Sequence, residues 1–127
     1  MKSRRVLSVG QCAMDHGTIS RYLEREFHAK VVRASDREEV ECELGAQEFD
    51  LILVNRIFDR DGTSGVELLR EWKEDPENTL APVMLVSNYP DAQQQAVALG
   101  ALPGFGKASL TSAATREKLA AVLQQGE

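Results

Sequence analysis

Apolar residues follow two alternating patterns along the chain. Short runs rich in Val, Ile and Leu recur, each too short for a helix, and they predict β-strands. These runs are "RVLSV" (5–9), "KVVRA" (30–34), "DLILVN" (50–55) and "PVMLVS" (82–87). The last two barely alternate in polarity, which is typical of strands covered by helices on both faces. We therefore expect them at the centre of a parallel sheet.

Between these runs, apolar residues recur about every 3.6 positions, which predicts amphipathic helices. The helix predicted over residues 15–27 has an apolar face made of Ile19, Tyr22, Leu23 and Phe27. Four more apolar faces are marked by Val40 and Leu44; Val66, Leu69 and Trp72; Ala92, Ala96 and Leu99; and Leu119, Val122 and Leu123. Strand and helix therefore alternate, as in folds built on a parallel sheet.

Local signals indicate two helix ends and a further strand. In "ASDREE", Ser35 is the expected N-cap of the second helix, its hydroxyl accepting a hydrogen bond from the backbone N–H near Glu38. Gly100 is the expected stop of the fourth helix. The stretch "LPGFGK" lies between two helices, so the alternation predicts that it forms a fifth strand.

This order of elements predicts an α/β fold of the doubly wound (βα)5 type, a three-layer sandwich with a five-stranded parallel sheet. The 127 residues predict one domain, 1–127, with its core over 4–124. Ligands of such sheets bind beyond the carboxyl ends of the strands. The candidate site residues are therefore those that end the strands: Gly10, Gln11, Asn55, Ser87 and Lys107.

Charge and cysteine content narrow the choice of function. Twenty acidic against fifteen basic residues give a net charge of −5, which repels nucleic acid and anionic membranes. No apolar stretch approaches the roughly 20 residues that span a bilayer, and the run from Val6 to Val9 is too short for a signal peptide. With only Cys12 and Cys42 as cysteines, we expect a reduced protein of the cytoplasm.

The strand ends and the element order over residues 4–124 resemble the receiver domain of bacterial response regulators. "PVMLVS" ends in Ser87, where this family has Ser or Thr, and "GALPGFGK" places Lys107 seven residues after Gly100, the usual interval for the family's lysine. "ASDREEVECELGAQEFDLILV" is similar to the family's second helix and third strand. The resemblance implies a flavodoxin-like, CheY-like fold and a role in two-component signal transduction.

The chemistry of this family depends on carboxylates that this chain lacks. The resemblance implies an acidic pair after the first strand and a phosphoryl-accepting aspartate after the third, which together hold Mg²⁺ through hard oxygens. Gly10 and Gln11 stand in place of the pair, and Asn55 stands in place of the acceptor. An amide is a poor nucleophile and a neutral ligand, so we expect neither metal binding nor aspartyl phosphate at this site.

Three further departures from the family fall on loops and on the fifth strand. The segment "NRIFDRDGTSG" (55–65) is longer than the resemblance implies. The family's switch aromatic on the fifth strand falls at Gly104, with Phe105 one place later. The family's lysine precedes a cis proline, whereas Ala108 follows Lys107, so we expect a trans bond and a shifted loop.

Other chemistry at single residues is less well supported. A nucleotide-binding loop at Lys107 would need a hydroxyl at Ala108 and a preceding strand. Cys12 and His16 have the spacing of zinc ligands on one helical face, but with two cysteines and two histidines in the whole chain we expect no closed zinc site. Ser87 lacks the surroundings of a nucleophile, and we expect it to be a strand-end hydroxyl.

Two alternatives stay open. Asp59 or Asp61 could enter the site as a nonstandard phosphoacceptor, although turn formation beside Gly62 is favoured, or a small molecule could bind in the emptied pocket. The loss of the carboxylates also leaves Lys107 without the counterions that the family provides. If its ammonium points inward, we expect burial to lower its pKa, unless one of these two carboxylates folds in or the lysine turns outward.

The sequence thus predicts a receiver-like signalling module of a two-component-type phosphorelay pathway that is independent of phosphorylation and is not an enzyme. We expect it to act through a protein partner that the sequence does not identify, with no metal, cofactor, nucleic acid or membrane, and a homodimer is left open. The expected partner surface lies over residues 91–124, with Tyr89 and Phe105 as its aromatic candidates.

Overall fold

The computed structural model of the chain describes residues 4–75 and 81–124, in which strand and helix alternate as predicted. The strands are β1 (Arg5–Val9), β2 (Lys30–Ala34), β3 (Leu51–Asn55), β4 (Val83–Val86) and β5 (Leu102–Phe105). The helices are α1 (Ala13–Phe27), α2 (Arg37–Ala46), α3 (Gly65–Glu74), α4 (Pro90–Ala98) and α5 (Ala113–Leu123), and a 3₁₀ turn spans Lys107–Ser109. The outer parts of the predicted domain, 1–3 and 125–127, and the segment 76–80 lie outside the described residues.

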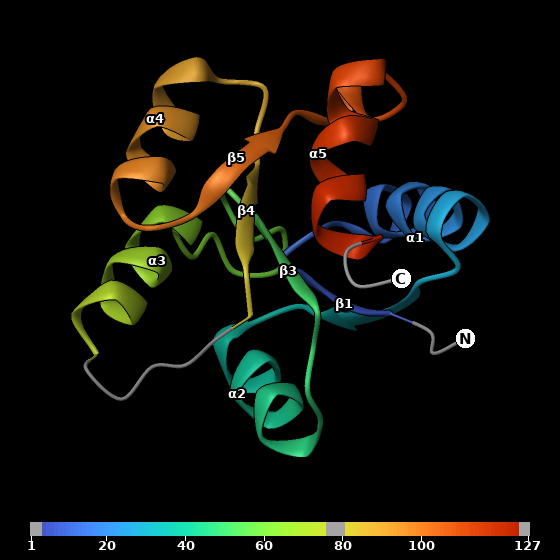
Figure 1. Cartoon of the computed structure of the whole chain (residues 1–127). Helices are drawn as coiled ribbons and strands as arrows, with labels where there is room; N and C mark the ends of the chain where they lie inside the picture. The colour runs from blue at the N-terminus through green and yellow to red at the C-terminus, as the bar shows by residue number, and fades with distance from the viewer. Residues whose placement is uncertain (1–3, 76–80, 125–127) are drawn as a thin grey trace.

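The five strands form one parallel sheet in the order β2-β1-β3-β4-β5, which confirms the predicted doubly wound α/β fold. Helices α1 and α5 pack on one face of the sheet, and α2, α3 and α4 pack on the other (Figure 1). Alternate residues of each inner strand enter the two cores, so Val6 packs toward α1 while Leu7 packs on the opposite side. This double coverage explains the continuous apolar runs at β3 and β4.

The start of α2 differs from the prediction by one residue. Its N-cap is Asp36 and not Ser35, because the Asp36 carboxylate accepts a hydrogen bond from the backbone N–H of Glu39 at 2.9 Å. The Glu39 carboxylate in turn accepts from the backbone N–H of Ser35 at 2.7 Å. The motif fits two registers, and the one adopted places a negatively charged cap at the positive end of the helix.

At the end of α4, by contrast, the predicted stop is confirmed. Gly100 has a φ of +100°, which a glycine adopts without the steric cost of a Cβ, and its N–H donates to the Val97 carbonyl at 3.0 Å. Within residues 4–75 and 81–124, no helix combines the length and the apolar character that crossing a bilayer requires.

The edge strand β5 contains one extra residue relative to β4. Met84 is aligned with Leu102 and Val86 with Phe105, so two steps along β4 correspond to three along β5. The irregular part includes Gly104, where an added Cβ would lie 2.1 Å from the Leu85 carbonyl oxygen. Only a glycine therefore lets the two backbones approach this closely.

Gln93 of α4 fills the space beside this bulge. Its Nε2 donates to the Leu85 carbonyl at 2.9 Å and to the Ser87 carbonyl at 3.1 Å, and its Oε1 accepts from the Gly104 N–H at 3.1 Å. One side-chain amide thus joins α4 to both β4 and β5. Gly104 is the position where the resemblance places the switch aromatic, and this glutamine packs against it.

Replacing Gln93 by alanine should lower the free energy of unfolding by about 1–3 kcal/mol, because backbone groups of β4 and β5 lose their partners. The matched control is Gln94→Ala at the exposed neighbouring position, which should change it by less than about 0.5 kcal/mol. Urea titration with unchanged slope measures both values. Equal losses for the two variants would show that the Gln93 amide does not join these elements.

Candidate functional site

The candidate residues lie at the carboxyl edge of the sheet, where the parallel strands end together. Gly10 and Gln11 follow β1, Asn55 ends β3, Ser87 follows β4, and Lys107 begins the 3₁₀ turn after β5. The strand order places the ends of β1, β3 and β4 side by side. Each of these residues is, however, engaged with another part of the chain.

The Asn55 side chain is held by two backbone carbonyls. Its Nδ2 donates to the Gly10 carbonyl at 3.1 Å and to the Ile57 carbonyl at 2.7 Å. Both N–H groups of the amide are therefore used within the chain. An amide bound in this way can hold the ends of β1 and β3 together, but it cannot serve as a phosphoryl acceptor.

The ring of Phe58 occupies the space next to Gly10. Phe58 is only 1% exposed, and a Cβ added at Gly10 would lie 2.5 Å from its Cδ1 atom. Gly10 also has a φ of +75°, and its carbonyl accepts the backbone N–H of Asp59 at 2.9 Å. The space beside the end of β1, where the resemblance implies an acidic side chain, is therefore filled by an aromatic ring.

Phe58 was missed as a site residue at the level of sequence. It lies in the long segment 55–65, which folds back on itself through a bridge between Ile57 and Ser64. Within this turn the Phe58 N–H donates to the Thr63 carbonyl at 2.8 Å. Two features of the sequence could have indicated this contact. Phe58 is the single aromatic residue in the charged stretch "NRIFDRDG", and Gly10 stands where the family has a carboxylate.

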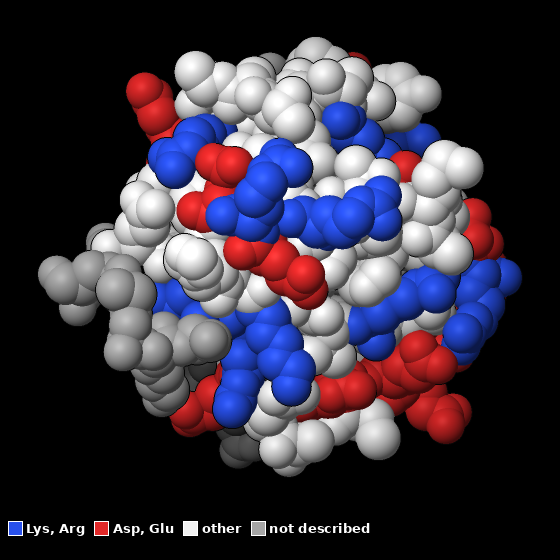
Figure 2. Space-filling view, turned by 90° about the vertical axis from the view of Figure 1, so that its right-hand side faces the viewer, with Lys and Arg blue, Asp and Glu red and all other residues white. Residues whose placement is uncertain are grey.

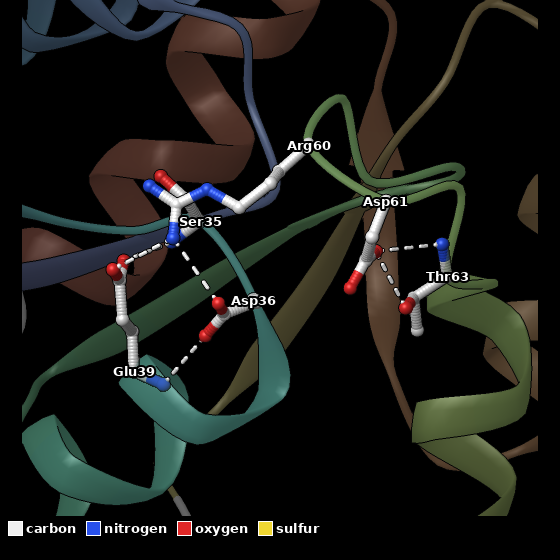
Figure 3. Close-up of polar contacts among 6 residues, drawn as sticks. All are labelled: Ser35, Asp36, Glu39, Arg60, Asp61 and Thr63. Atoms are coloured by element: carbon white, nitrogen blue, oxygen red, sulfur yellow. Dashed lines mark hydrogen bonds and ion pairs between the residues drawn. The ribbon is translucent and has the colours of Figure 1, made fainter.

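Neither Asp59 nor Asp61 supplies the missing carboxylate. The Asp61 carboxylate accepts from the backbone N–H of Thr63 at 3.0 Å and from its hydroxyl at 2.6 Å (Figure 3). These bonds lower the pKa of Asp61 and fix it as a turn residue, as expected beside Gly62. Asp59 is exposed.

The same loop is tied to the start of α2 through Arg60. Its guanidinium lies 3.1 Å from the Asp36 carboxylate and 2.9 Å from that of Glu39, the two residues that form the cap of this helix (Figure 3). The pKa of Glu39 is lowered by the Ser35 N–H and then by Arg60. The loop is therefore fixed at its inner side by Phe58 and at its outer side by an ionic contact.

Lys107 pairs with a carboxylate that the sequence interpretation did not consider. Its Nζ lies 2.7 Å from the Asp15 carboxylate, in the first turn of α1. The inward, unpaired lysine, which the sequence left open as one case, is therefore not found, and Lys107 does not pair with Asp59 or Asp61 either. The Lys107 ammonium, aided by Cys12 and opposed by partial burial, holds the pKa of Asp15 below its ordinary value.

The remaining candidates have structural partners. The Ser87 hydroxyl accepts the backbone N–H of Tyr89 at 3.1 Å, which fits the expected strand-end role. Gln11 is buried, and its carbonyl accepts from Arg33 at 3.3 Å. Cys12 is the N-cap of α1 and accepts the Asp15 N–H at 3.4 Å. In the described part of the chain, no three His, Cys, Asp or Glu side chains are grouped as ligands of a metal ion.

The two aromatic candidates for a partner surface differ in their exposure. Tyr89 is 60% exposed, and the Arg56 guanidinium lies 4.8 Å from its ring centroid. Phe105 is 3% exposed and packs in the core beside α1 and α5, so its assignment to the surface is wrong. The extra residue in β5 explains this, because a shift by one position exchanges the two faces of a strand.

As expected, the bond between Lys107 and Ala108 is trans.

Solved structures of response regulators superpose on this chain over nearly its whole length. The signal receiver domain of a DNA-binding response regulator from Colwellia psychrerythraea is 21% identical, with a TM-score of 0.76 and coverage of 97% of this chain and 100% of that one. A response regulator from Thermotoga maritima is 19% identical, with a TM-score of 0.76 and coverage of 98% and 100%. This chain has the receiver fold of response regulators.

A third solved structure with the receiver fold contains a phosphorylated residue. A response regulator from Burkholderia pseudomallei is 25% identical, with a TM-score of 0.68 and coverage of 97% of this chain and 68% of that one. Its structure contains a phosphorylated aspartic acid, a calcium ion and citrate. No protein-family model and no curated protein matches this chain.

The two glycines at +75° provide a matched test of the contact in the receiver site. An alanine at Gly10 meets Phe58, whereas one at Gly62 meets nothing within 4 Å, so both variants carry the same backbone strain but only one is overpacked. Gly10→Ala should reduce the free energy of unfolding by about 1–3 kcal/mol more than Gly62→Ala. Adding Phe58→Leu to the first variant should recover part of the difference. Equal losses in urea titrations would contradict the tight packing of Phe58 on Gly10.

The ion pair of Asp15 predicts a pH-dependent contribution to stability. A carboxyl group whose pKa is lower in the folded than in the unfolded state stabilises the folded protein. Its contribution is complete above the unfolded-state pKa of about 3.9, and it is lost as the pH falls through the folded-state pKa. Because both partners are about one-third exposed, Asp15→Asn should cost only about 0.2–1 kcal/mol at neutral pH and nothing in acid. Thermal unfolding across pH, with the exposed Glu117→Gln as control, measures this difference. A loss that persists in acid would show that the pair is not its cause.

Proposed function

We propose that this chain is a pseudo-receiver: a signalling module of a two-component-type phosphorelay pathway that works through contact with a protein partner. It acts independently of phosphorylation and catalyses no reaction. The observation that carries this proposal is the Asn55 amide, which stands at the acceptor position and is bound to the carbonyls of Gly10 and Ile57. The receiver fold supports the signalling role, and this side chain argues against the phosphoryl chemistry.

The residues present do not fit the Mg²⁺ that the receiver family implies. Such an ion needs several oxygen ligands in near-octahedral geometry. The end of β1 offers Gly10 with the Phe58 ring packed against it, and the end of β3 presents amide donors, which repel a cation. The cationic Lys107 is already compensated by Asp15, so the site has no excess negative charge to attract a metal.

The two alternatives lose support from the same contacts. The Asp61 carboxylate is held by Thr63, and the exposed Asp59 carboxylate forms no hydrogen bond or ion pair within the described residues that would fix it in the site. A small molecule would need the space beside the end of β1, and Phe58 fills that space. We therefore place the function on the surface of the domain.

Charge and cysteine state agree with a protein partner in the cytoplasm. On the face shown in Figure 2, Lys and Arg side chains lie among Asp and Glu and form no continuous basic field. Together with the net charge of −5, this argues against nucleic acid as a partner. Cys12 and Cys42 are both free thiols, as a reducing compartment would keep them. The partner surface over residues 91–124 stays a prediction, now without Phe105.

Incubation with acetyl phosphate and Mg²⁺ tests the proposal directly. Intact mass should show no phosphorylated species, because the chain has no acceptor carboxylate at the end of β3. A phosphorylated peptide containing Asp59 or Asp61 would contradict the proposal and favour a nonstandard acceptor. Mg²⁺ at millimolar concentration should also leave the melting temperature unchanged, since a ligand stabilises only a state that binds it.

The single variant Asn55→Asp separates the loss of the nucleophile from the loss of the metal site. It should remain unphosphorylated, because Phe58 still fills the space beside Gly10 and the acidic pair is still absent. Phosphorylation of this variant with normal Mg²⁺ dependence would show that the contact between Phe58 and Gly10 does not close the site.

A further inference from the structure

A groove of about 470 Å³ runs between α3 and α4 at the carboxyl edge of the sheet. The start of α3 and the start of α4 form its walls, and the residues after β3 and after β4 form its end. Two large apolar side chains line it and remain exposed, Ile57 at 40% and Tyr89 at 60%. Two of the large apolar side chains that the fold leaves exposed therefore lie at one groove.

Four charged residues also line this groove, and three of them have compensation within the chain. Glu67 and Arg70 form an ion pair at 3.4 Å. Asp91 lies in the first turn of α4, where the helix macrodipole stabilises a carboxylate. Arg56 differs from these, because no carboxylate of the described residues forms an ion pair with it.

Arg56 instead stacks on an aromatic ring, with its guanidinium 4.8 Å from the centroid of Tyr89. No hydrogen bond or ion pair within the described residues uses the side-chain N–H groups of Arg56. Those donors match the two oxygens of a carboxylate, which arginine binds in bidentate fashion. Arg56 is thus a cationic fork over an aromatic ring, and Ile57 lines the same groove.

We propose that this groove docks a short acidic and apolar segment of a partner protein. A carboxylate of the segment binds the Arg56 fork, and a neighbouring apolar side chain packs between Ile57 and Tyr89. This inference rests on the proposed function and extends it, because it states which chemical groups of the partner are recognised. The overall charge of −5 does not oppose it at contact range, because salt screens charges beyond about 8 Å at physiological ionic strength.

Selection from a displayed library of random peptides tests this occupant and does not require the natural partner to be identified. We expect the selected peptides to carry Asp or Glu next to an aliphatic or aromatic residue. Amide shifts of the labelled protein on titration with such a peptide should centre on Arg56, Ile57, Ser64, Tyr89 and Asp91. Selection of basic or purely apolar peptides, or shifts centred on residues 104–118, would overturn the proposal.

Variants of the groove identify the contribution of the fork. Arg56→Gln should weaken binding of a selected peptide about tenfold or more, as expected for a lost charge-assisted contact. Arg56→Lys should recover only part, because lysine keeps the charge without the bidentate geometry. Tyr89→Ala should also weaken binding, whereas Val97→Ala, an exposed apolar residue of α4 outside the groove lining, should not.

Three further outcomes would count against the proposal. Equal affinity for the native protein and Arg56→Gln would show that the fork is not used. Concentration-dependent self-association through the same residues would make a second copy of the chain the occupant. If no peptide is selected, or if acidic and apolar peptides do not bind at millimolar concentration, the groove does not bind this class of ligand. The proposed function is tested separately, because phosphorylation by acetyl phosphate does not depend on whether the groove binds a peptide.

Discussion

The packing of Phe58 against Gly10 is the contact on which the carboxyl edge of the sheet depends. It brings the connection between β3 and α3 across the end of β1, where the Gly10 carbonyl accepts both the Asn55 amide and the Asp59 N–H. One backbone oxygen thereby links two strand ends and a loop. Because any side chain at position 10 would meet the ring, the glycine and the phenylalanine are constrained as a unit. A change at either residue affects the whole edge.

Two cations at this edge, Lys107 and Arg60, are balanced within the chain, whereas Arg56 has no carboxylate partner among the described residues. Lys107 is compensated by Asp15 and Arg60 by Asp36 and Glu39, and the strand ends carry an amide and a hydroxyl in place of carboxylates. A site that crowds three carboxylates holds repulsion that a metal ion relieves. Here that repulsion is absent, because the strand ends carry an amide and a hydroxyl. This charge balance supports the proposal that the domain acts without phosphorylation.

Much of the fold could be predicted because its signals are local. Runs such as "DLILVN" and the helical spacing of Ile19 and Phe27 report burial directly, and burial decides which residues enter the core. The site was harder to predict, because its key pairs join distant positions: Lys107 with Asp15, and Phe58 with Gly10. No spacing rule connects such residues. The error at Phe105 came from one unpaired residue in β5, which a pattern of alternating polarity cannot locate.

The amide of Gln93 has a consequence for how the domain meets other molecules. Since it bonds to Leu85, Ser87 and Gly104, α4 cannot slide along β5 unless three partly buried hydrogen bonds break together. These bonds favour a single position of α4, and a partner that binds this position would lose no affinity to a conformational fraction. The amount of complex formed with a partner would then depend on the concentration of the domain and not on a change in its conformation.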